Sequence, residues 1–263
     1  MGSCQWGGLA DDVPRGWSAV GHALSGSLQL RSPAYLTTMS TTDLSGAWKS
    51  FDFVQPPQEL VTASGAIDLL APVGAFTLTQ AQMLAAAGVF GPGYAGAFGH
   101  AYDAQGIRAL AGKSERALGD IGRVKSFKGY NDLLILRMRS IAAVDEDPPR
   151  SFLGTHVDAE SSSDRAVRRD ADEAVRKYWR ISAERRRTIA RSVRDHGHLP
   201  MLVTVSKRIV GARNVTGIDE AATAADGVKV VLNVEPATGW YHDFAGTWLN
   251  SGRGVPTIWW ERS

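Results

Sequence analysis

The sequence of 263 residues contains a single cysteine, Cys4. An internal disulfide is therefore excluded, which favours the cytoplasm or another reducing compartment, and a virion is also compatible with it. No apolar run reaches the roughly 18 residues that a membrane-spanning helix needs. The N-terminus has no basic segment followed by an apolar stretch, so no secretory signal is expected.

The chain also has little net charge. The formal net charge is +2 at pH 7, which by itself does not indicate a nucleic-acid or membrane partner. Apolar residues make up 44% of the chain, enough for a chain of this length to bury a core without a structural metal. Met1-Gly2-Ser3-Cys4 is similar to an acylation site, but Trp6 stands where Ser or Thr is usual, so we interpret it as an ordinary terminus.

The distribution of turn-forming residues predicts two parts. Residues 1–60 are rich in Gly, Ser and Thr and contain few periodic runs, so we expect a loop-rich N-terminal extension. Residues 61–263 are expected to form the main domain, of the α+β class. Asp145-Glu146-Asp147-Pro148-Pro149 is a polar break, and it marks a candidate internal boundary near 145–150.

Local spacing predicts the principal elements of this domain. Thr77 and Gln80 have the spacing of a capping box before a short helix that stops at Gly88, and a second helix is expected over 103–118. A long basic helix is predicted over 163–196, where Ser182 is a possible N-cap that would divide it. Strands are expected at 133–141, 201–205, from 209, at 227–234 and at 257–260. The C-terminal part is therefore β-rich, with the basic helix inserted.

Two glycine-containing segments have part of the pattern of nucleotide-binding loops. Gly106 to Ser114 ends like a phosphate-binding loop, but Ile107 stands where a small residue is needed. The segment 91–96 has the spacing of a dinucleotide fingerprint, but Pro92 stiffens the turn that should bend around a pyrophosphate. We interpret both segments as ordinary glycine-containing structure.

The predicted helix 163–196 has eleven basic and six acidic residues, a local excess of five positive charges. Such a helix can lie on nucleic-acid phosphates, but many of its charges lie within i, i+3 or i, i+4 reach of an opposite partner, which is typical of a solvated, ion-paired face. At its end, His196 and His198 could share a metal, or His196 could simply occupy a helix C-terminus, where a cation is favoured.

One constellation of side chains points to metal chemistry. In a strand, residues i and i+2 project to the same face, so His156 and Asp158 can bind one cation together. With the distant His242 they would fill three sites and leave others open, which suits ferrous iron that binds a co-substrate and dioxygen. Arg253 could then bind a carboxylate of that co-substrate in a forked pair.

With these residues the chain resembles the iron(II)- and 2-oxoglutarate-dependent oxygenases, most closely over 227–260. The resemblance implies a double-stranded β-helix that holds Fe(II) and 2-oxoglutarate and hydroxylates a small-molecule or macromolecular substrate. It implies three iron ligands: His156, Asp158 and His242. Arg253 would bind 2-oxoglutarate, although Val255 stands where the family often has Ser or Thr.

Other functions remain open at this stage. His156 and His242 can equally be polar loop residues. The loop-rich first sixty residues, the glycine-rich segment 88–99 and the eight tryptophans are typical of a structural or assembly protein of a virion or other large particle, which would contact like or unlike subunits. A third hypothesis is nucleic-acid binding through the helix at 163–196, and His242-Asp243 could then act as acid and base in a nuclease-like site.

Overall fold

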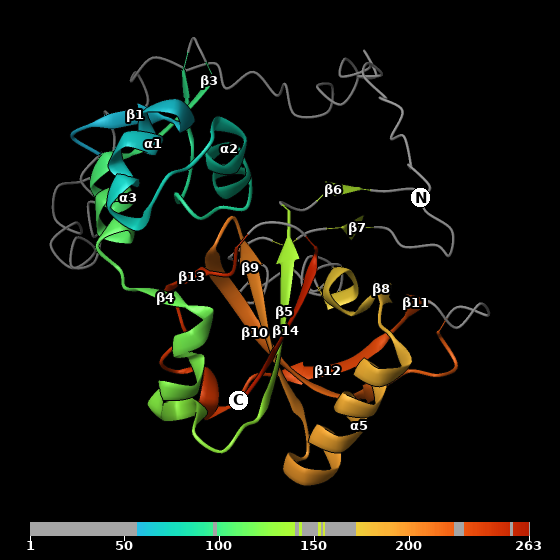
Figure 1. The fold of residues 1–263 in the computed structure, drawn as a ribbon. Coiled ribbons are helices and arrows are strands. Elements are labelled where there is room, and N and C mark those ends of the chain that lie inside the picture. Colours follow the sequence, from blue (N-terminus) through green and yellow to red (C-terminus); the bar gives the residue numbers. More distant parts are fainter. Residues whose placement is uncertain are drawn as a thin grey trace, which may run out of the picture. The chain divides into compact units, whose positions relative to one another are not determined.

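The computed structural model describes residues 57–96, 99–139, 142–143, 152–153, 155, 172–223, 229–252 and 255–262. They belong to one structural unit, Gln55–Ser263 (Figure 1). The predicted extension lies outside them as far as residue 56, and the first described strand begins at Leu60.

The first part of the unit is a three-stranded antiparallel sheet with three helices. The sheet has the order β1-β3-β2. Its strands are β1 (Leu60–Thr62), β2 (Tyr94–Gly96) and β3 (Gly99–Asp103). The helices are α1 (Ala63–Leu69), α2 (Leu78–Ala86) and α3 (Ala104–Ala111), with a 3₁₀ turn, η1 (Ala71–Val73). Their apolar faces bury a common core that includes Leu70, Leu84 and Ile107.

The second part is a mixed seven-stranded sheet. Six strands follow the order β14-β5-β9-β10-β13-β4, and β12 pairs with β10. Their bounds are β4 (Glu115–Ala117), β5 (Asp132–Met138), β9 (Leu199–Val205), β10 (Arg208–Ile218), β12 (Leu232–Pro236), β13 (Trp248–Asn250) and β14 (Thr257–Glu261). The pairs β5/β9 and β13/β4 are parallel, and the others are antiparallel.

Two short two-stranded ladders lie beside this sheet. The first pairs β6 (Ala142–Ala143) with β7 (Phe152–Leu153), and the second pairs β8 (Trp179–Arg180) with β11 (Lys229–Val230).

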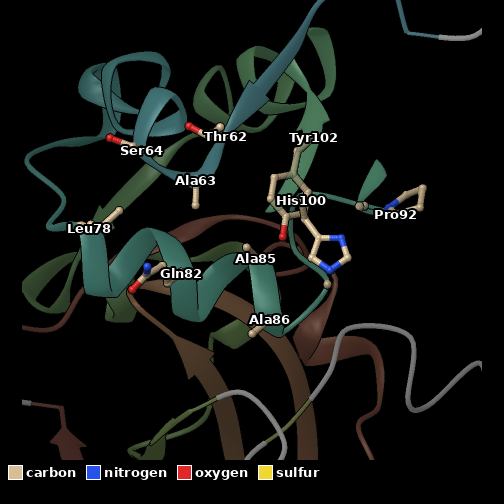
Figure 2. Close-up of a pocket in the computed structure, with 13 residues that line it drawn as sticks. Thr62, Ala63, Ser64, Leu78, Gln82, Ala85, Ala86, Pro92, His100 and Tyr102 are labelled. Atoms are coloured by element: carbon tan, nitrogen blue, oxygen red, sulfur yellow. The ribbon is translucent and has the colours of Figure 1, made fainter. Parts of the chain in front are cut away.

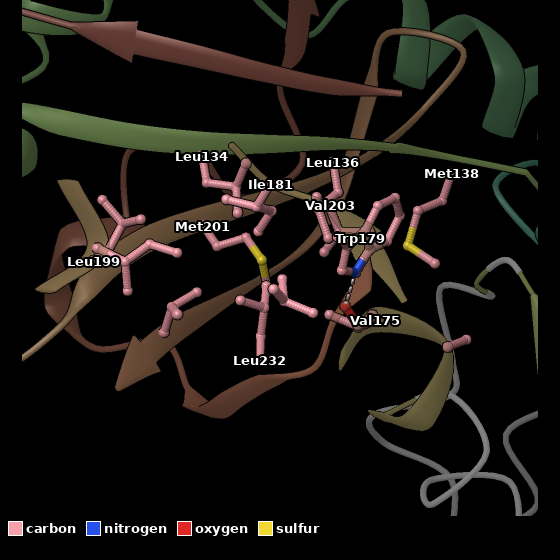
Figure 3. Packing of buried hydrophobic residues seen from close by; sticks show 14 residues of the cluster. Leu134, Leu136, Met138, Val175, Trp179, Ile181, Leu199, Met201, Val203 and Leu232 are labelled. Atoms are coloured by element: carbon pink, nitrogen blue, oxygen red, sulfur yellow. Dashed lines mark hydrogen bonds between the residues drawn. The ribbon is translucent and has the colours of Figure 1, made fainter. Parts of the chain in front are cut away.

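Helix α5 (Ala183–His196) covers one face of the large sheet. Alternate residues of β5, among them Leu134 and Leu136, face Ile181 and Trp179, and Figure 3 shows this packing. The indole Nε1 of Trp179 donates to the carbonyl of Val175 at 2.6 Å, which satisfies the one polar group of that buried side chain.

The other face of the sheet is covered by short 3₁₀ segments, which lie on the opposite side from α5 in Figure 1. They are η2 (Leu118–Arg123), η3 (Lys125–Phe127) and η4 (Gly239–Tyr241). Their core is aromatic, and the fully buried ring of Phe127 lies at its centre, against Leu133 and Ile135 of β5. Because β5 is apolar on both faces, it reads as a continuous run of hydrophobic residues.

The predicted helix caps are confirmed. Thr77 and Gln80 form the expected reciprocal capping box at the start of α2, and Gly88 follows its end with a left-handed φ of 77°. Ser182 is the N-cap of α5 and accepts a hydrogen bond from the Arg185 N–H. Gly197 ends that helix in the left-handed conformation. Each of these features depends on residues within one helical turn.

Several predicted elements need correction. The helix over 163–196 is not continuous: residues 172–176 are helical, but β8 follows and α5 begins only at Ala183. The pairing of β8 with β11 and the burial of Trp179 in the core interrupt the helix. The predicted helix 103–118 ends at Ala111, because residues 115–117 pair with β13. The strand predicted at 227–234 is described as two, β11 and β12, on either side of Val231.

The α+β class is confirmed, with a sheet-rich C-terminal part. The predicted double-stranded β-helix finds no support in the part of the chain that is described. That fold requires two facing antiparallel sheets, whereas the large sheet here is single and mixed, with helix on one face and 3₁₀ segments on the other. Within the same ranges, no helix is both long and apolar enough to cross a bilayer.

Candidate functional site

Of the four residues in the predicted iron site, three lie outside the described residues: His156, Asp158 and Arg253. The fourth, His242, is exposed and follows η4. Among the described residues, no group of three His, Cys, Asp or Glu side chains is arranged to hold a metal. The iron and 2-oxoglutarate site therefore stays a prediction, as does the alternative of an assembly protein.

The neighbour of His242 has a structural role. The carboxylate of Asp243 accepts a hydrogen bond from the Ser126 N–H at 3.0 Å, and the Ser126 hydroxyl donates to the Trp240 carbonyl at 2.8 Å. These contacts join η4 to η3. The hydrogen bonds from Ser126 lower the pKa of Asp243, so this carboxylate is a weak base and a poor candidate for the predicted acid–base pair.

The histidines at the end of α5 meet a tyrosine that sequence spacing did not single out. The hydroxyl of Tyr130 and Nε2 of His198 share a hydrogen bond of 3.1 Å. The Tyr130 ring centroid lies 5.3 Å from that of His196 and 5.4 Å from that of His198. Tyr130 itself stacks on Phe127 at 5.2 Å. The pair of histidines therefore contacts an aromatic core, and no metal group among the described residues includes them.

Burial adjusts the protonation of this cluster. The pKa of His198 is lowered, first by burial and then by the neighbouring His196, while Glu235 opposes the shift. Burial also raises the pKa of the Tyr130 hydroxyl. At neutral pH the cluster is thus an uncharged, half-buried pair, Tyr130 and His198, beside the exposed imidazole of His196.

Basic residues occur on three segments that lie next to this cluster, and we call the whole the Tyr130 surface. They are Arg123, Lys125 and Lys128 before β5, Arg191 and Arg194 on α5, and Arg262 after β14, all of them exposed. Arg262 connects two of the segments, because its guanidinium donates to the carbonyls of Gly122 and Tyr130. Arg191 connects the third to them through Asp132, the first residue of β5.

Carboxylates balance only part of this positive charge. Arg123 pairs with Asp120 at 3.2 Å, Arg191 with Asp132 at 3.0 Å and Arg194 with Asp195 at 3.1 Å. Lys125 and Lys128 have no carboxylate within 4.0 Å among the residues that the structure describes, and the same holds for Arg262. An exposed excess of positive charge next to aromatic rings is a recognised footprint of nucleic-acid contact.

A separate pocket of about 890 Å³ opens in the first part of the unit (Figure 2). It lies between α2, the start of α1 and β3, and its polar groups include those of Gln82, His100 and Tyr102. Gly93 lies against the last two, since a Cβ there would be 3.3 Å from each of them. The glycine segment 91–96 leads into the β2/β3 hairpin and not from a strand into a helix, so it is not a dinucleotide-binding turn.

The second candidate nucleotide-binding segment, Gly106 to Ser114, does not form a phosphate-binding loop either. Gly106 and Ile107 lie within α3, and Gly112 is its C-cap, so the backbone that would need to wrap a phosphate is helical.

Comparison of the chain with models of protein families, with curated proteins and with solved structures found no match.

Proposed function

We propose that the protein binds single-stranded nucleic acid through the Tyr130 surface. Its lysines and arginines would contact backbone phosphates, and bases would stack on the exposed His196 imidazole, whose ring centroid lies 5.3 Å from that of Tyr130. The observation that carries the proposal is that Arg262 and Arg191 join the segment after β14 and helix α5 to the Tyr130 segment, beside the Tyr130–His196 ring contact.

The chemistry of the cluster favours single strands. An unstacked base can lie on an imidazole or phenol ring, and each such contact contributes about 1–3 kcal/mol. A duplex keeps its bases stacked, so it offers phosphates and groove edges but no open base face for stacking. The C-terminal half of α5 contributes Arg191 and Arg194, so the proposal assigns the predicted role of the whole helix to its C-terminal turns alone.

The decisive measurement is fluorescence anisotropy with a labelled single-stranded oligonucleotide of about 16 nucleotides, close to the largest site size expected. The logarithm of the affinity should fall linearly with the logarithm of salt concentration, because binding releases counterions. Replacing Lys125→Glu and Lys128→Glu together should weaken binding and lower the salt slope by about 1–2, since each lost phosphate contact lowers it by about 0.7–1.

A matched control is Lys113→Glu with Arg139→Glu. Both residues are exposed and lie away from the Tyr130 surface, after α3 and after β5. This pair makes the same change in net charge, so it should leave affinity within about twofold if binding is local. Affinity that does not depend on salt, or an equal loss in both double variants, would contradict the proposal.

A further inference from the structure

Arg208, the first residue of β10, is a cation inside the protein. Arg208 comes directly after the two-residue turn between β9 and β10, and only 8% of the residue is exposed. Its guanidinium lies over the indole of Trp248, 5.1 Å from the ring centroid, on the neighbouring strand β13. This contact covers one face of the guanidinium but supplies no hydrogen-bond acceptor.

One hydrogen-bonding group of Arg208 has no partner among the described residues. Its Nη1 is buried and has no partner, and no carboxylate among the described residues lies within 4.0 Å of the guanidinium. Arg213, on the same strand and equally buried, is the opposite case: it donates to Asp172 at 2.9 Å and to the Ala212 carbonyl. A buried guanidinium usually has such partners, because an uncompensated charge in the interior costs several kcal/mol.

Arg208 lines a pocket of about 260 Å³. The wall is formed mainly by apolar groups of Val89, Leu110 and Val210, together with Tyr241 and Gly246, and none of the described acidic residues lines it. Gly246 has a left-handed φ of 64°, and a Cβ there would lie only 3.2 Å from Nη2 of Arg208. Glycine thus keeps the space in front of the guanidinium open.

The surroundings also favour a negative charge. Burial lowers the pKa of Arg208 to about 10, so the group remains a cation at neutral pH. A second arginine, Arg116, reaches the same 241–246 loop by donating to the Asp243 carbonyl, and its buried Nε has no partner within the part of the chain that is described. Ser206 and Lys207 have positive φ because they form the two-residue turn between β9 and β10, whose geometry matches the twist of the two strands.

We propose that the Arg208 pocket binds a small oxyanion, a phosphate or a carboxylate group, which pairs with this guanidinium. A planar fork of N–H donors in an apolar pocket matches two oxygens of such a group. The volume is below the range of about 300–1,000 Å³ of ordinary ligand sites, which limits the occupant to a small anion or the terminal anionic group of a larger molecule. The site does not depend on the Tyr130 surface.

The test is isothermal titration of the whole chain with inorganic phosphate and, separately, with acetate, each at constant ionic strength set with chloride. We expect saturable binding of at least one of the two anions. Arg208→Met, which keeps the length and apolar contacts of the side chain, should weaken that binding by about 10- to 100-fold, the usual effect of losing charged hydrogen bonds. Comparison of the two anions identifies which oxyanion the site prefers.

The matched control is Arg213→Met, which removes an equally buried arginine from the same strand and should leave anion binding within about twofold. A second variant, Gly246→Ala, places a methyl group beside Nη2 and should also weaken binding, which keeps the proposal testable if Arg208→Met does not fold. The proposal is overturned if neither anion binds saturably, or if binding survives unchanged in both pocket variants.

Discussion

Phe127 is the residue on which the aromatic core beneath the Tyr130 surface depends. Its side chain is fully buried. Four aromatic rings surround it, with centroid separations between 5.2 and 6.0 Å: Tyr130, Trp240, Phe244 and Trp260. Replacing Phe127→Ala removes the central ring and leaves a cavity that its neighbours, held by η4 and β14, can fill only in part.

The expected loss is large. A buried Phe→Ala change costs about 3–5 kcal/mol of unfolding free energy, and this site should lie in the upper half of that range. The reason is the number of aromatic contacts, since each aromatic pair contributes about 0.5–1.5 kcal/mol beyond the area it buries. Phe90 offers a control: it is 4% exposed but has a single aromatic neighbour, Tyr102, at 5.6 Å.

Urea denaturation followed by tryptophan fluorescence measures both variants, because Trp240 and Trp260 contact Phe127 directly. Phe127→Ala should lower the midpoint at an unchanged slope. Its free-energy loss should exceed that of Phe90→Ala by at least about 1 kcal/mol. An equal or smaller loss for Phe127→Ala would refute the argument that the four-ring contact stabilises this face of the sheet.

Two further predictions concern protonation and metal binding. Burial and His196 lower the pKa of His198 from 6.5 in the folded protein. As pH falls, His198 is therefore protonated in the unfolded chain before it is protonated in the folded protein, so the unfolding free energy should fall below about pH 6.5. Urea titrations should show a flatter pH dependence in His198→Gln, and an identical slope in both proteins would contradict this. The oxygenase resemblance predicts that chain purified without chelator binds Fe(II) and turns over 2-oxoglutarate. Metal analysis of His156→Ala should then find the iron lost, and iron retained in that variant would rule out the ligand set.

The Tyr130 surface illustrates what sequence reasoning could not reach. The charge excess at 163–196 and the histidines at its end were visible as patterns, and two of its eleven basic residues, Arg191 and Arg194, belong to the surface. Tyr130 and His198 are 68 residues apart in the chain, and Arg262 reaches Gly122 across 140 residues. No local spacing relates such positions, so nothing in the sequence indicated that Lys125 and Lys128 would join the basic helix.

Arg208 is a similar case from the interior. In the sequence it is one arginine among many, in the run Ser206-Lys207-Arg208 beside a predicted strand. Both arginines are buried, but only Arg213 has a carboxylate partner among the described residues. That partner is Asp172, which lies 41 residues away in the chain. The partner of a buried charge is chosen by packing, not by chain neighbours.

The sequence by itself determined the α+β class and the approximate positions of β5 and β9, and it marked Ser182 as a possible N-cap, where α5 indeed begins. These features follow from periodicity and from capping contacts between residues at most four positions apart. Tertiary structure alone decided the order of the large sheet, the strand β8 that interrupts the predicted helix, and the convergence of charges around Tyr130. The physical reason is range: a cap satisfies its hydrogen bonds within one turn, whereas strand pairing and burial depend on contacts between segments that the chain brings together only on folding.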